Sequence, residues 1–111
     1  MEGTLNKISN VINWYEGANI KHLEELNKAL KVITSNMYLL ELERAKYHEK
    51  HQDIMYELTN NQDKPVSKAE IVANKNVPEL YLLRRVMNAA YRCSDSIRTN
   101  ISYMKKELSN T

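Results

Sequence analysis

Hydrophobic residues recur at alternating steps of three and four along two long stretches of the chain. The first heptad stripe comprises Leu23, Leu26, Leu30, Ile33, Met37, Leu40, Arg44, Tyr47, His51, Ile54 and Leu58, and the second comprises Leu80, Leu83, Met87, Ala90, Ser94, Ile97, Ile101, Met104 and Leu108. A seven-residue repeat keeps its members on one side of a helix, so each stripe needs an apolar partner. The pattern therefore predicts an all-α fold, a long antiparallel and coiled-coil-like helical hairpin.

Shorter signals divide the chain into segments of one helical domain, residues 1–111. Apolar residues at helical spacing predict a short N-terminal helix over 4–16, and Gly17 and Asn19 mark its end. The first long helix is expected over 20–59 and the second over 77–108, with Asn76 as the N-cap of the second. The connection, 60–76, is expected to hold a short helix from about 68 to 74, because Ser67 and Glu70 have the spacing of a capping box.

The composition supports a helical fold, but a hairpin of this size cannot bury all of the apolar side chains. The chain has 111 residues with only two Gly, two Pro and no Phe, so helix formers dominate. A hairpin this small hides one stripe of each helix, and apolar side chains remain outside the stripes. These residues predict an oligomer interface: Leu39, Leu42, Leu82, Val86, Trp14 and Tyr15. The alternative is that the N-terminal segment docks on the hairpin and covers part of this surface.

The chemistry-bearing residues give little sign of catalysis. Cys93 is the only cysteine, so no disulfide forms within the chain and a reducing compartment is expected. His48 and His51 share a helical face without a third ligand at suitable spacing. For His51, a hydrogen-bonded position in the stripe, an exposed position and a metal ligand are the alternatives. We expect a protein that is not an enzyme and uses no cofactor and no metal.

No basic start followed by an apolar run marks a leader, and no apolar run has the length of a membrane span. We therefore expect a cytoplasmic protein without a membrane partner.

Charge is distributed unevenly, although the net charge is only +2. The second long helix carries six basic against three acidic residues, whereas residues 21–59 carry six basic against seven acidic ones. Tyr81, Tyr91 and Tyr103 are interleaved with the basic residues, a mixture that suits phosphate contacts and base stacking. The predicted nucleic-acid-binding residues are Arg84, Arg85, Arg92, Arg98, Lys105, Lys106 and Tyr91. A solvated basic face with half-buried tyrosines is the alternative.

The layout resembles the UvsY-type recombination mediators of T4-like phages over about residues 36–108. The similarity lies in Lys46-Tyr47-His48-Glu49-Lys50, in Lys68-Ala69-Glu70, in Asn74-Lys75-Asn76-Val77, and in Ile97-Arg98 with Ile101 downstream. The resemblance implies a small, helical, oligomeric protein that helps a recombinase displace single-strand-binding protein from single-stranded DNA.

Three functions follow as hypotheses. The first is a non-enzymatic homo-oligomer that binds single-stranded DNA in phage recombination or replication. The second is a small phage-encoded helical inhibitor or adaptor that binds a host protein, for example a defence-system protein. Its acidic residues would face a basic partner: Glu41, Glu43, Glu49, Asp53 and Glu57. The third is a structural assembly subunit.

Overall fold

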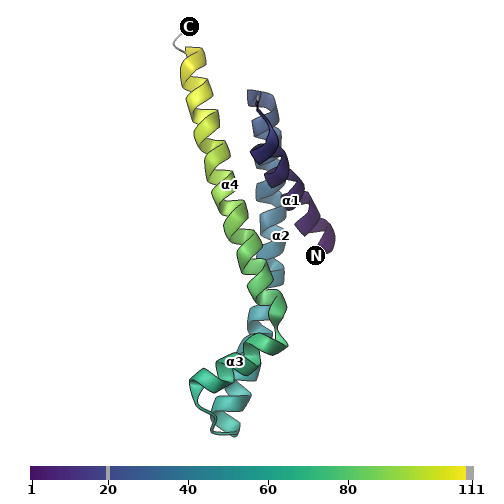
Figure 1. The fold of residues 1–111 in the computed structure, drawn as a ribbon, viewed down its shortest axis with the longest axis vertical. Helices are drawn as coiled ribbons and strands as arrows, with labels where there is room; N and C mark the ends of the chain where they lie inside the picture. Colours follow the sequence, from purple (N-terminus) through teal and green to yellow (C-terminus); the bar gives the residue numbers. More distant parts are fainter. Residues whose placement is uncertain (20, 110–111) are drawn as a thin grey trace. The chain divides into compact units, whose positions relative to one another are not determined.

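The computed structural model describes residues 1–19 and 21–109, and this part of the chain is helical apart from short connections. The elements are helix α1 (Glu2–Gly17), helix α2 (Leu23–Tyr56), the π-helix η1 (Glu57–Asn61), helix α3 (Val66–Asn76) and helix α4 (Pro78–Ser109) (Figure 1). The prediction of an all-α fold with two long helices is confirmed. Ile20, the predicted first residue of the long helix, lies outside the described residues.

The chain divides into two compact units, and each is described by itself. Unit 1 comprises Met1–Leu40 and Val86–Thr111, and unit 2 comprises Glu41–Arg85. Unit 1 therefore contains α1, the first half of α2 and most of α4. Unit 2 contains the second half of α2, η1, α3 and the first two turns of α4.

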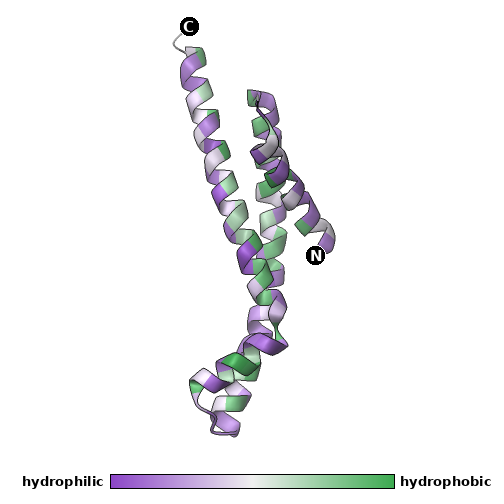
Figure 2. Cartoon of the chain, in the orientation of Figure 1, coloured by the Kyte–Doolittle hydropathy of each residue, from purple (hydrophilic) through white to green (hydrophobic). Residues whose placement is uncertain are grey.

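The heptad stripes form the core, as their spacing predicts. Every position of the first stripe is buried or half-buried, and in the second stripe only Leu108 is exposed. In unit 1 the two segments of α2 and α4 run in opposite directions beside each other (Figure 1), and Ile33 and Ile97 have no exposed surface. Figure 2 shows hydrophobic and hydrophilic residues alternating along each helix. This alternation is expected when one side of a helix is buried and the other is solvated.

Helix α1 completes the core of unit 1. Ile8 of α1 is fully buried, and Ala29 and Asn36 of α2 are buried although they lie outside the first heptad stripe. The side chains of Tyr15 in α1 and Asn100 in α4 are hydrogen-bonded to each other. The N-terminal segment therefore docks on the long helices within the chain.

Unit 2 folds around the connection between the two long helices. Leu58 of η1 packs into its core, and α3 contributes Ala69 and Ala73. A turn joins η1 to α3, in which Asp63 has a φ of 51° and the backbone N–H of Lys64 donates to the carbonyl of Leu58 at 2.9 Å. Asp tolerates this left-handed conformation better than most residues. The turn lets α3 pack against η1 after only four connecting residues.

The helix boundaries differ from those predicted at the connection. The regular α-helical hydrogen bonding of α2 ends at Tyr56, and a π-helix replaces its last turn. The prediction of Asn76 as the N-cap of α4 is wrong, because Asn76 is the last residue of α3 and its amide donates to the Val72 carbonyl at 2.8 Å. Helix α3 begins at Val66, so Ser67 lies inside it rather than at its cap.

Candidate functional site

The predicted nucleic-acid-binding residues are distributed over both units. Arg84 and Arg85 belong to unit 2, whereas Arg92, Arg98, Lys105, Lys106 and Tyr91 belong to unit 1. All seven side chains are exposed. Each group is therefore accessible to a ligand within its own unit.

In unit 1 the basic residues follow the heptad frame of α4. Tyr91, Arg98 and Lys105 are seven residues apart, and Arg92 and Lys106 are separated by two heptads. Residues at this spacing repeat along one row of a helix. The row of Tyr91, Arg98 and Lys105 lies beside the buried stripe of α4, and the second row lies about 100° further around the helix, so the two rows together form a broad, exposed basic strip. The heptad frame was the sequence signal for this arrangement.

Within the described residues, most basic side chains of α4 lack the ion pairs that several basic side chains of α2 form. In α2, Lys28, Arg44 and Lys46 lie 3.8, 3.3 and 3.5 Å from a glutamate one turn earlier. Within the described residues, α4 has one ion pair, between Arg98 and Asp95 at 3.4 Å. The other five basic side chains of α4 have no carboxylate within ion-pairing distance there. Their charge therefore remains uncompensated by a close acidic group.

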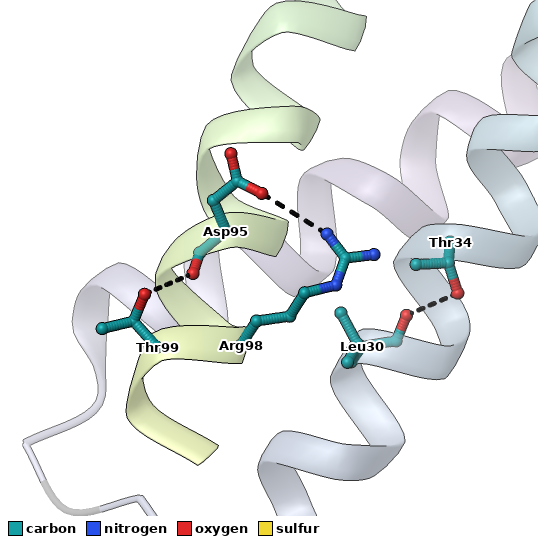
Figure 3. A network of polar contacts seen from close by, with 5 residues as sticks. All are labelled: Leu30, Thr34, Asp95, Arg98 and Thr99. Atoms are coloured by element: carbon teal, nitrogen blue, oxygen red, sulfur yellow. Dashed lines mark hydrogen bonds and ion pairs between the residues drawn. The ribbon is translucent and has the colours of Figure 1, made fainter. Parts of the chain in front are cut away.

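Arg98 has a different environment from its basic neighbours. Figure 3 shows its side chain extending from α4 toward α2 on the side of Leu30 and Thr34, with one guanidinium nitrogen turned back to Asp95. The Asp95 backbone carbonyl also accepts a hydrogen bond from the Thr99 hydroxyl at 3.0 Å. Arg98 is thus partly neutralised by Asp95 while its side chain extends toward α2.

Unit 2 contains a polar pocket of about 440 Å³ that residues of three helices line. Its polar lining includes His48, His51, Glu70, Asn74, Tyr81 and Arg84. Buried Val77 and Leu80 supply an apolar part of the lining. The spacing of His48 and His51 indicated their common face, but Glu70 and Asn74 join them only because α3 folds back onto α2.

One hydrogen bond fixes the position of the His51 ring in this pocket. His51 Nε2 and Asn74 Oδ1 are 2.8 Å apart, a distance at which Nε2–H donates to the amide oxygen. The other ring nitrogen, Nδ1, is buried without a hydrogen-bond partner. Of the three alternatives for His51, the structure shows a hydrogen-bonded residue, with its partner in α3.

The residues predicted for an oligomer interface differ in exposure. Leu39, Leu42 and Leu82 are 46%, 49% and 49% exposed. Val86 and Trp14 are half-buried, as is Tyr15, whose hydroxyl is already bonded within the chain. The three leucines are thus the part of this predicted interface that is most available to a second copy.

An apolar groove of about 430 Å³ lies between α1 and α2 in unit 1. Val11, Trp14 and Val32 line it, and Lys7 and Glu25 contribute charged groups. The Trp14 and Tyr15 rings are 6.5 Å apart, and Lys21 Nζ lies 4.7 Å from the centre of the Tyr15 ring. Trp14 therefore lines the groove, while Tyr15 anchors α1 through its hydrogen bond to Asn100.

Cys93 lies in the interior of unit 1 and is 8% exposed. Burial, and secondly the negative charge of Glu16, raise the pKa of the Cys93 thiol above its ordinary value of 9.0. Both causes disfavour the thiolate, which is the nucleophilic form of cysteine. The environment is therefore that of a packing residue.

We expect Cys93 to react with iodoacetamide at least about tenfold more slowly in the folded protein than in urea, because attack requires local opening. Folding raises the pKa of the Cys93 thiol, so the neutral thiol contributes to the stability of the folded state. This contribution is complete below pH 9 and is lost as the pH rises through the pKa that the thiol has in the folded protein. Mass spectrometry after timed alkylation measures the rate. Equal rates in the two states would contradict the buried position.

Within the described residues no group of three or more His, Cys, Asp or Glu side chains is placed to hold a metal ion. None of the described helices is both long enough and apolar enough to span a membrane. Compared with models of protein families, with curated proteins and with solved structures, the chain matches none.

Proposed function

We propose that this chain is a non-enzymatic, oligomeric helical protein that binds single-stranded DNA through the basic residues of α4. The observation that carries the proposal is the absence of ion pairs, within the described residues, at five of the six basic side chains of that helix: Arg84, Arg85, Arg92, Lys105 and Lys106. A basic residue without a nearby carboxylate keeps its full charge for a phosphate.

The aromatic residues of α4 support a single strand as the ligand. Tyr91 and Tyr103 are 46% and 63% exposed in unit 1, among the basic residues. Exposed aromatic rings stack on unpaired bases, which a duplex keeps stacked within itself. The combination favours single-stranded over double-stranded DNA and fits a mediator of phage recombination or replication that acts in the host cytoplasm.

Self-association would strengthen such binding. Leu39, Leu42 and Leu82 expose apolar surface that a second copy could cover. Each chain carries few phosphate-binding residues, so its own affinity is modest. Several copies on one strand would bind far more tightly than one, because each bound copy raises the effective concentration of the next.

We expect the protein to bind a fluorescein-labelled single-stranded oligonucleotide in an anisotropy titration, with log affinity falling linearly as log salt rises. Each neutralised phosphate of a single strand contributes about −0.7 to this slope, so a slope of about −3 corresponds to four or five phosphates. Light-scattering mass on the same samples reports the subunit number with and without DNA. A duplex of the same length serves as the control.

No binding at low salt would remove the proposal. Binding that is indifferent to salt would also contradict it, since phosphate contacts release counterions. A monomer that binds DNA would contradict only the oligomeric part.

A second candidate is a helical adaptor or inhibitor that binds a protein partner. The apolar groove between α1 and α2 favours it, because Val11, Trp14 and Val32 give a lining suited to apolar side chains. Among the acidic residues proposed for a basic partner, Glu43, Glu49 and Asp53 line one hollow, but Lys46 and Lys50 line it too. Mixed charge makes that hollow a poor match for a strongly basic partner.

A further inference from the structure

The polar pocket of unit 2 has a size and composition that suit a small ligand. Its volume of about 440 Å³ lies in the range of small-molecule sites. All residues that line it belong to unit 2, and they come from α2, from α3 and from the start of α4. The pocket therefore shares no residue with the basic strip of unit 1.

One part of the lining suits a nucleobase. Tyr81 is 68% exposed and lines the pocket, so one region of its ring is available for stacking. Arg85 lies over the same ring, 5.8 Å from its centre, and holds it by a cation–π contact. Buried Val77 and Leu80 add apolar surface beside the ring.

Another part of the lining suits a phosphate. Arg84 and His48 are both exposed and line the pocket, and neither has an ion-pair partner among the described residues. A guanidinium group donates two parallel hydrogen bonds to a phosphate, and an imidazole adds a third donor. The Glu70 carboxylate also lines the pocket, where it would repel a phosphate but accept hydrogen bonds from the amino group of a base.

The pocket is partly ordered in advance. The 2.8 Å hydrogen bond between His51 and Asn74 joins α2 to α3 and fixes two of the polar side chains of the lining. Side chains fixed before binding lose less entropy when a ligand arrives.

We propose that this pocket binds one nucleotide unit, with the base against Tyr81 and the phosphate at Arg84 and His48. This inference rests on the proposed function, because it adds a base-binding position in unit 2 to the backbone contacts of unit 1. The ligand is a unit of a single strand or a free nucleotide, and both offer the same base and phosphate.

The test is an NMR titration of the full chain with three ligands: deoxyadenosine monophosphate, deoxyadenosine and inorganic phosphate. The side-chain signals of His48, His51 and Tyr81 report on the pocket, and the indole signal of Trp14 in unit 1 is the internal control. We expect saturable shifts with the nucleotide in the millimolar range. Deoxyadenosine and phosphate should each bind about tenfold more weakly, because each makes half of the contacts.

Two variants separate the two halves of the site. Tyr81→Leu should weaken the nucleotide about tenfold and leave phosphate binding unchanged, since only stacking is lost. Arg84→Gln should weaken the nucleotide and phosphate alike. Tyr56→Leu and Lys75→Gln are the matched controls, because both are exposed residues of unit 2 that do not line the pocket and have no part in the proposed DNA binding. Circular dichroism confirms that each variant keeps its helices.

The outcomes separate this inference from the proposed function. DNA binding through unit 1 without nucleotide shifts in unit 2 would overturn the pocket alone. Nucleotide shifts without retention of an oligonucleotide would support the pocket and overturn the proposed function. Phosphate that binds as tightly as the nucleotide, or a Tyr81→Leu variant that binds the nucleotide normally, would overturn the base-binding position. A single strand that competes for the same signals identifies the strand as the source of the unit.

Discussion

The triple variant Arg92→Gln/Lys105→Gln/Lys106→Gln is expected to bind single-stranded DNA about tenfold to a hundredfold more weakly than the wild type at 0.1 M salt. These three side chains are exposed in unit 1 and have no ion pair among the described residues. Removing three phosphate contacts should also reduce the slope of log affinity against log salt by about 2. Anisotropy titrations at four salt concentrations measure both quantities.

The control for this variant has the same change of net charge in α2. Lys28→Gln/Arg44→Gln/Lys46→Gln removes three basic residues that lie within 4 Å of a glutamate. Its affinity should change little, because those charges are already compensated. Arg98→Gln should have a smaller effect than Arg92→Gln, since Arg98 is paired with Asp95. Equal losses in the two triple variants would show that net charge alone, and not the surface of α4, governs binding.

The second large effect concerns the core. Leu40→Ala is expected to lower the free energy of unfolding by about 2 to 5 kcal/mol, because Leu40 has no exposed surface and the truncation leaves a cavity. Urea unfolding followed by circular dichroism measures it. The loss should be the same at low and high protein concentration, since the packing lies within one chain.

Leu39→Ala is the matched control, because Leu39 is the adjacent residue of the same type but is 46% exposed. This substitution should lower the free energy of unfolding by less than about 1 kcal/mol at low protein concentration. If Leu39 lies in an oligomer interface, an additional cost appears as the concentration rises. A cost for Leu39→Ala equal to that of Leu40→Ala at every concentration would contradict the assignment of Leu40 to the core and Leu39 to the surface.

Much of the fold was predictable from local periodicity. Ile33 and Ile97 lie on stripes whose seven-residue repeat follows from helix geometry, and both are buried. Gly17 ends α1 where the sequence predicts a stop. The excess of basic residues in α4 was equally visible, because charge depends on residue type alone.

The candidate sites were less predictable, because they depend on which helices meet. The sequence placed His48 and His51 on one face, but it did not indicate that Asn74 of α3 would bond His51 or that Glu70 and Arg84 would line the same pocket. The basic residues of α4 could not be distinguished from one another in the sequence. In the structure, Asp95 compensates the charge of Arg98 and of no other basic residue of α4 within the described residues.

The sequence by itself determined the helices, their buried stripes and the distribution of charge, since these follow from the backbone period and from residue type. The tertiary structure alone decided that α1 docks on α2 and α4 through Ile8 and Tyr15. It alone also decided that α3 closes a polar pocket against α2 and the start of α4. Contacts between residues far apart in the chain depend on the direction of each turn and on the fit of side chains, and no local pattern records either.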